Sequence, residues 1–121
     1  MTGWKRDDEE AGSRLRRAAV DTAHAILREE IGVIDGARRL SSLAHRLVDD
    51  WRVDPDFLVF GALDTETDHL PVGAQRALWD PAALVDKDAM VARIEAVARA
   101  DVEMACRNVI ARFGDVPRPL T

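Results

Sequence analysis

Three residues with side chains typical of a hydrolase are spaced four apart: Ser41, His45 and Asp49. In a helix this spacing places all three on one face, and serine, histidine and carboxylate together can perform nucleophilic hydrolysis. Such a nucleophile usually lies on a sharp turn beside N–H groups that stabilise an oxyanion, whereas the N–H groups inside a helix are already bonded. We therefore predict a polar helix flank and no catalytic residue, with a serine/histidine hydrolase as the alternative.

Carboxylates and a histidine could also bind a metal ion. Asp64, Glu66 and Asp68 alternate as in a calcium-binding loop, but the sixth position of that loop is His69 instead of glycine, and the twelfth is Gln75 instead of glutamate. We expect these groups to be solvated or to cap helices. The sequence thus predicts neither a metal nor another cofactor, and a small metal-dependent hydrolase is the alternative.

The single cysteine, Cys106, excludes an internal disulfide bond. A reactive cysteine needs a lowered pKa and access to solvent. Cys106 instead lies in a segment with apolar residues at helical spacing, and we predict that it is a small buried side chain of the core.

Acidic residues are concentrated in residues 49–68, where seven carboxylates accompany one base, Arg52. This segment has a net charge of −6, and the rest of the chain sums to +1. A negative field speeds encounter with a basic protein and disfavours direct binding of nucleic acid. Tryptophan, which is enriched at the centres of interfaces, lies within the segment at Trp51 and beyond it at Trp79.

These features predict a surface that binds a basic protein partner. Its residues are expected to be Asp49, Asp50, Trp51, Asp64, Glu66, Asp68, His69 and Trp79. The alternative is a solvated acidic face over a core cluster of aromatic residues, and the sequence does not decide which tryptophan is exposed.

Composition is typical of a globular protein, with 47% apolar and 32% charged residues in a chain of 121. The N-terminus has no apolar stretch of the kind found in signal peptides. The longest apolar run, residues 57–63, is far shorter than the roughly 20 residues that span a bilayer. We expect a cytoplasmic protein, monomeric or homodimeric, that does not associate with membranes.

Apolar residues recur at helical spacing and predict an all-α fold of four to five helices. The first helix is expected to run from Asp7 or Ala11 to Ile31 and to stop at Gly32. A cap at Asp35 would begin the second helix. Because the connection is short, these two helices should form an antiparallel pair.

Aspartate followed by proline predicts a helix start at Asp54 and again at Asp80. The first of these helices would be short and would bury Phe57, Phe60 and Leu63; a buried strand is the competing interpretation of this apolar run. Residues 64–73 are expected to form the main loop, followed by a brief helical turn over residues 74–79. A long last helix should end at Gly114 and, because its apolar residues cover more than one face, lie at the centre of the fold.

Three stretches and one tryptophan resemble segments of small uncharacterised bacterial proteins of similar length. The stretches are residues 32–43 (Gly-Val-Ile-Asp-Gly-Ala-Arg-Arg-Leu-Ser-Ser-Leu), 56–60 (Asp-Phe-Leu-Val-Phe) and 64–73 (Asp-Thr-Glu-Thr-Asp-His-Leu-Pro-Val-Gly), and the tryptophan is Trp79. The resemblance covers residues 30–113 and implies no catalytic residue. In size, acidity and lack of catalytic groups the chain is also similar to bacterial immunity proteins, which neutralise a toxin by binding it.

The sequence therefore predicts one helical domain over residues 1–121, with loose ends at residues 1–10 and 115–121. The leading hypothesis is a non-enzymatic acidic protein that docks a basic partner, such as an immunity protein bound to a nuclease-like toxin. A hydrolase and an accessory subunit of a larger assembly are the alternatives.

Overall fold

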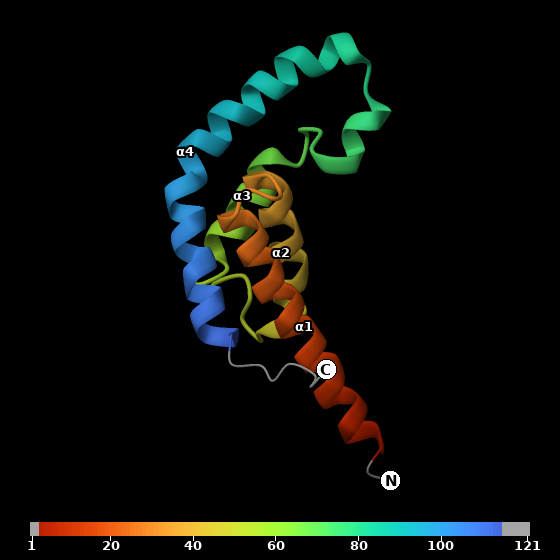
Figure 1. Cartoon of the computed structure of the whole chain (residues 1–121), viewed down its shortest axis with the longest axis vertical. Coiled ribbons are helices and arrows are strands. Elements are labelled where there is room, and N and C mark those ends of the chain that lie inside the picture. The colour runs from red at the N-terminus through yellow and green to blue at the C-terminus, as the bar shows by residue number, and fades with distance from the viewer. Residues whose placement is uncertain (1–2, 115–121) are drawn as a thin grey trace.

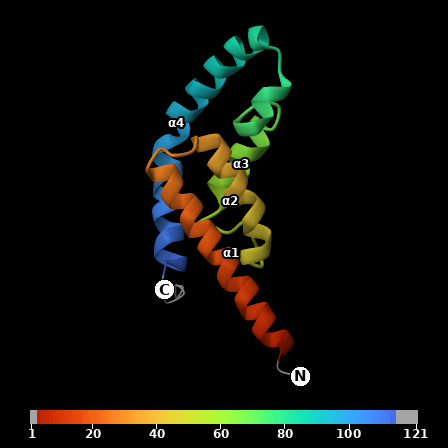
Figure 2. The ribbon, with the colours of Figure 1, turned by 45° about the vertical axis from the view of Figure 1, so that its right-hand side comes forward.

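The computed structural model describes the backbone of residues 3–114 and the side chains of residues 9–114. Within this range the regular elements are helices and no strand occurs, which confirms the all-α prediction. In chain order they are α1 (Gly3–Leu27), α2 (Val33–Leu47), α3 (Leu58–Thr67), the short 3-10 helix η1 (Gly73–Leu78) and α4 (Pro81–Phe113). The helices α1 and α2 run antiparallel, and α4 passes along both (Figures 1 and 2). Residues 115–121, expected to be a loose end, lie outside the described range.

The first helix is displaced towards the N-terminus relative to the prediction. It begins at Gly3, so that residues 3–10 are helical, and it ends at Leu27 instead of Ile31. The residue that turns the chain is Glu29, with a positive φ of 59°. The N–H groups of Glu29 and Glu30 then bond to the carbonyl oxygens of Ile26 and Ala25, at 3.0 and 2.9 Å. This is a Schellman motif with glutamate in the position that glycine usually occupies.

The start of α2 depends on a residue of another helix. Its N-cap is Gly32, which makes no side-chain capping bond, and Asp35 lies within the first turn and not at the predicted cap position. The carboxylate of Glu95, on α4, accepts a hydrogen bond of 2.9 Å from the N–H of Ile34 instead. The cap predicted from local sequence is therefore supplied by tertiary structure.

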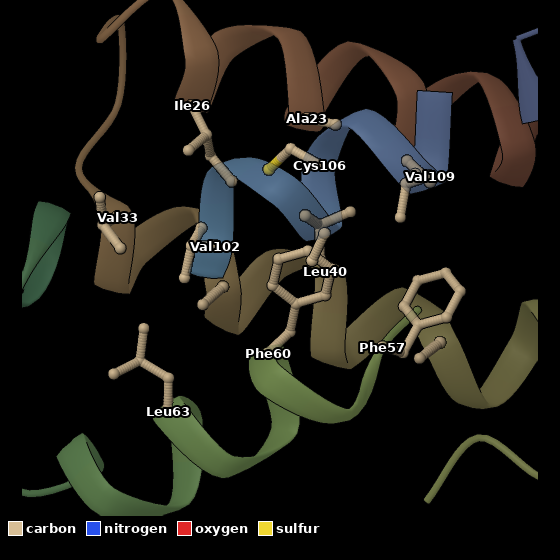
Figure 3. Close-up of a cluster of buried hydrophobic side chains, with 14 of the residues drawn as sticks. Ala23, Ile26, Val33, Leu40, Phe57, Phe60, Leu63, Val102, Cys106 and Val109 are labelled. Atoms are coloured by element: carbon tan, nitrogen blue, oxygen red, sulfur yellow. The ribbon is translucent and has the colours of Figure 1, made fainter. Parts of the chain in front are cut away.

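The core lies where all four α-helices meet (Figure 3). Its aromatic residues are Phe57 and Phe60, with ring centroids 6.1 Å apart, and Phe113 packs against Phe57. Leu63 is buried as predicted. The remaining members of the cluster come from α1, α2 and α4: Ala19, Ala23, Ile26, Val33, Ile34, Ala37, Leu40, Ala44, Val102, Ala105, Cys106 and Val109.

The helix pair α1–α2 packs closely at Gly36. A Cβ atom added to this buried glycine would lie 2.3 Å from Cγ1 of Ile26. Two carbon atoms that are not bonded to each other do not come this close. Only glycine, which has no Cβ, therefore allows α1 and α2 to pack as closely as they do at Gly36.

The helix α3 extends through the first part of the segment that we expected to be a loop. It ends at Thr67, so Asp64 and Glu66 lie on helix and not in loop. Arg38 of α2 donates to the carbonyl oxygens of Thr67, the last residue of α3, and of Leu70; the Thr67 carbonyl also accepts the N–H of Leu70 at 2.9 Å. The loop prediction is wrong for residues 64–67, where Arg38 of α2 contacts Asp64 and Thr67 of α3 and so supports the last turn from a distant part of the chain.

The two Asp-Pro pairs give different outcomes. Asp80 caps α4 as predicted, with its carboxylate accepting a hydrogen bond of 3.0 Å from the N–H of Ala82. Asp54 accepts an equivalent bond from the N–H of Asp56, also 3.0 Å, but this begins a turn, and α3 starts only at Leu58. The predicted short helix is present, and the strand interpretation is wrong.

The long helix α4 packs on the domain with one face only. Its fully buried residues belong to its C-terminal part, while its N-terminal half extends past α2 and α3 to reach η1 (Figures 1 and 2). Val97 and Met104 are 84% and 62% exposed. The prediction of a central helix is therefore wrong, because the other helices all lie on one side of α4. Within residues 3–114 no helix is both long and apolar enough to cross a membrane.

Candidate functional site

Three of the seven carboxylates in residues 49–68 pair with arginine side chains from other helices. Asp54 and Asp56 both accept bonds of 2.9 Å from the guanidinium of Arg112, which joins the end of α4 to the turn before α3. This pairing raises the pKa of Arg112 above its ordinary value, with the hydrogen bond to Asp54 as the main cause. Asp64 lies 3.7 Å from Nε of Arg38. Its predicted role in partner binding is weakened, because its charge is already paired.

The other four carboxylates of residues 49–68 are not paired with an arginine or lysine side chain of the described chain. Asp49, Asp50, Glu66 and Asp68 are all exposed. Within the described part of the chain, Asp49, Asp50 and Glu66 form no ion pair, and Asp68 has only His69 nearby, at 3.8 Å. We call these four residues the acidic surface. The structure thus reduces the acidic segment to four charges that are free to meet a partner.

A hollow of about 470 Å³ lies beside Trp51. Its lining is mostly apolar, with Arg52 and Glu66 as the charged residues, and comprises Trp51, Arg52, Phe57, Leu58, Gly61, Ala62, Thr65 and Glu66. Leu58 is 52% exposed, although α3 already buries Phe60 and Leu63 on its other side. A helix that is apolar on both faces usually has something packed on both. This hollow therefore offers an apolar contact area next to Glu66 of the acidic surface.

The indole of Trp51 is held in place by two neighbours. The ring of His45 meets it edge-on at a centroid distance of 6.2 Å, and the guanidinium of Arg52 lies 5.2 Å from its centroid. Such contacts are each of modest strength. They orient a half-buried aromatic ring at the edge of the hollow, which is suitable geometry for an interface residue.

A second hollow, of about 240 Å³, lies just beyond the end of α3 and joins three of the predicted residues. Asp68, His69 and Trp79 line it together with Leu70, Pro71, Gln75 and Leu78. Trp79 is 37% exposed, with Nζ of Lys87 at 5.9 Å from its ring centroid. Trp79 is thus no member of the aromatic core, and it is the more exposed of the two tryptophans.

A third hollow, of about 290 Å³, lies between the start of α2 and α4 and was not anticipated from the sequence. Its charged residues Asp35, Arg76, Asp88 and Glu95 are all occupied by contacts within the protein. Asp35 pairs with Arg39 at 3.0 Å and Arg76 with Asp88 at 2.7 Å. No local sequence signal could have identified this hollow, because residues from four separate elements and loops form it.

The three residues that suggested hydrolysis do not all lie on one helix face. Val48, the C-cap of α2, is in an extended conformation, so Asp49 has left the helix that holds Ser41 and His45. Ser41 is half-buried against α3, while His45 is exposed beside Trp51.

Metal ligation has equally little support in the geometry. Glu66 and His69 form a Glu-x-x-His pair at the end of α3, but among residues 9–114 no group of three or more histidine, cysteine, aspartate or glutamate side chains lies close enough to hold a metal ion. The alternation of Asp64, Glu66 and Asp68 is not a calcium loop, because the first two residues belong to a helix.

Cys106 is fully buried, as predicted. Burial raises the pKa of its thiol to about 12, and the nearby carboxylate of Glu103 adds a smaller effect of the same sign. A thiol with so high a pKa is protonated at neutral pH and is a poor nucleophile. Cys106 is therefore a core residue.

Comparison with models of protein families, with curated proteins and with solved structures gave no match. The chain's resemblance to small bacterial proteins thus stays a prediction from its residues.

Proposed function

We propose that this chain is a non-enzymatic binding protein that docks a basic protein partner through the acidic surface and the hollow beside Trp51. One observation carries the proposal: Trp51 and Glu66 line an open, mostly apolar hollow, and four exposed carboxylates in or next to the same segments, Asp49, Asp50, Glu66 and Asp68, are not neutralised by an arginine or lysine of the described chain. Charges around an apolar centre are the usual anatomy of a specific interface.

The partner's chemistry follows from the surface. Lysine or arginine side chains would meet Asp49, Asp50, Glu66 and Asp68, while an apolar side chain enters the hollow between Trp51 and Leu58. The paired carboxylates Asp54, Asp56 and Asp64 would keep their contacts with Arg112 and Arg38. The biological role that fits best is that of an immunity protein, which masks a basic, nuclease-like toxin.

The experiment is capture of the partner by tagged full-length chain at low salt, followed by identification and measurement of the dissociation constant of the purified pair. The quadruple variant D49N/D50N/E66Q/D68N removes the acidic surface without changing side-chain size. We expect it to weaken binding by at least tenfold and to flatten the salt dependence, because the electrostatic part of the affinity is lost.

A matched control removes four other exposed carboxylates that form no ion pair within the described residues: Glu10, Asp21, Glu30 and Asp86. The variant E10Q/D21N/E30Q/D86N changes the net charge equally. Near-normal binding by this control, together with weak binding by the first variant, would support the proposal. If both variants bind the partner as tightly as the unmodified chain does, the acidic surface is not part of the interface.

A further inference from the structure

The outer face of α4 carries apolar side chains that the other described residues leave mostly exposed. Val97 and Met104 are among the most exposed apolar residues of the protein, whereas Val102 and Cys106, close by on the same helix, are fully buried. The exposed pair is separated by seven residues, which is close to two helical turns, so both side chains lie on one stripe.

The residues of this stripe are arranged symmetrically about Val97. Four positions before it is Arg93 and four positions after it is Asp101; seven positions before it is Met90 and seven after it is Met104. Arg93 and Asp101 are exposed, and neither forms an ion pair within the described residues. Being eight residues apart, they are separated by about 12 Å along the helix and cannot pair with each other in one chain.

Two antiparallel copies of α4, related by a two-fold axis at Val97, would give each of these five residues a partner in the other copy. In that arrangement, a residue before Val97 in one copy lies opposite a residue after Val97 in the other copy. The two residues are equally far from Val97 in the chain. Arg93 then meets Asp101 twice, Met90 meets Met104 twice, and Val97 meets its own copy. A parallel pair would instead place Arg93 beside Arg93, so the charges select the antiparallel arrangement.

We propose that the outer face of α4 binds a second copy of this chain as an antiparallel helix pair centred on Val97. Such an interface is self-complementary, as two-fold symmetry requires. Because α3 and Trp51 lie outside the stripe, this proposal is independent of the docking of a basic partner.

Charge exchange tests the proposal in the full chain by sedimentation over a range of protein concentrations. We expect the unmodified protein to be in a monomer–dimer equilibrium, and R93D and D101R each to raise its dissociation constant about tenfold, since each turns two ion pairs into two repulsions. The double variant R93D/D101R should dimerise normally. A mixture of the two single variants should form a heterodimer, because one copy then offers only acids and the other only bases.

Cysteine crosslinking tests the orientation. V97C should form a disulfide-linked dimer on mild oxidation, because the two copies of this position meet at the axis, while buried Cys106 does not interfere. M104C alone should not crosslink, since its two copies lie about 21 Å apart along an antiparallel pair, but it should crosslink to M90C in a mixture.

A protein that remains monomeric, single variants that dimerise normally, or M104C that crosslinks to itself would each overturn the proposal. All substituted side chains are partly or fully exposed, and an unchanged thermal transition of each variant would exclude unfolding as the cause.

Discussion

The carboxylate of Glu95, in the middle of α4, accepts a hydrogen bond of 2.9 Å from the backbone N–H of Ile34, in the first turn of α2. The two residues are 61 positions apart in the chain. Because Gly32 offers no side chain at the N-cap, Glu95 takes over the capping role and also places a negative charge at the positive end of the helix dipole. The start of α2 is thus fixed only once α4 has docked.

Replacing Glu95 by alanine should therefore destabilise the protein by about 1 kcal/mol, the usual effect of losing a helix cap. The variant E95Q keeps an acceptor oxygen and should therefore lose less stability than E95A. Urea unfolding measures both values. E30A, the same change at an exposed position, should be neutral within about 0.5 kcal/mol, and an equal loss in E30A and E95A would contradict a capping role.

Two glycine-to-alanine substitutions should have opposite effects. G36A places a Cβ 2.3 Å from Ile26 and should destabilise by roughly 1–3 kcal/mol through overpacking. G61A, in α3, would place its Cβ 3.8 Å from Oγ of Ser41, an ordinary contact, and should stabilise by about 0.5–1 kcal/mol because alanine favours helix.

G61A also separates binding from stability, since Gly61 lines the hollow beside Trp51. If the hollow receives a partner's side chain, this variant should be more stable and yet bind less tightly. Unfolding curves and the partner titration, performed on the same preparation, would reveal the combination. Unchanged affinity would show that the floor of the hollow is not contacted.

Replacing Glu29 by glycine should stabilise the protein. Its φ of 59° lies in the left-handed region, which costs a residue with a side chain roughly 1 kcal/mol more than glycine. E29G also loses the exposed contact with Arg99, at 3.5 Å, which is worth little. We expect a net gain of about 0.5 kcal/mol in the free energy of unfolding. E30G, at the next residue, serves as the control and should bring no gain.

Cys106 should make stability dependent on pH in the alkaline range. The folded pKa, about 12, exceeds the ordinary value of 9.0, so the folded state keeps a proton that the unfolded state loses. Stability is therefore complete below pH 9.0 and falls as pH rises towards 12, by up to about 1.4 kcal/mol per unit. The difference between the unmodified protein and C106A, measured by urea unfolding, should shrink along this range; a constant difference would contradict a buried neutral thiol.

Local sequence determined the features that depend on neighbouring residues. Asp80 and Pro81 begin α4, and Gly114 ends it, because a cap and a stop need only the adjacent backbone. Phe57, Phe60, Leu63 and Cys106 are buried as predicted, since their large or small apolar side chains recur at helical spacing. These residues were enough to predict an all-α fold with a long last helix.

Tertiary structure decided which charges and faces are left for function. Whether Asp54 or Asp56 can meet a partner depends on Arg112, which lies 58 residues from Asp54 in the chain. In the same way Arg38 binds carbonyl oxygens at and just after the end of α3, and Glu95 caps the start of α2. The apolar residues of α4 cover more than one face in the sequence, but the fold supplies helices on only one side, which leaves Val97 and Met104 exposed. Contacts between distant segments cannot be read from periodicity, because periodicity records which side chains share a face and not what that face meets.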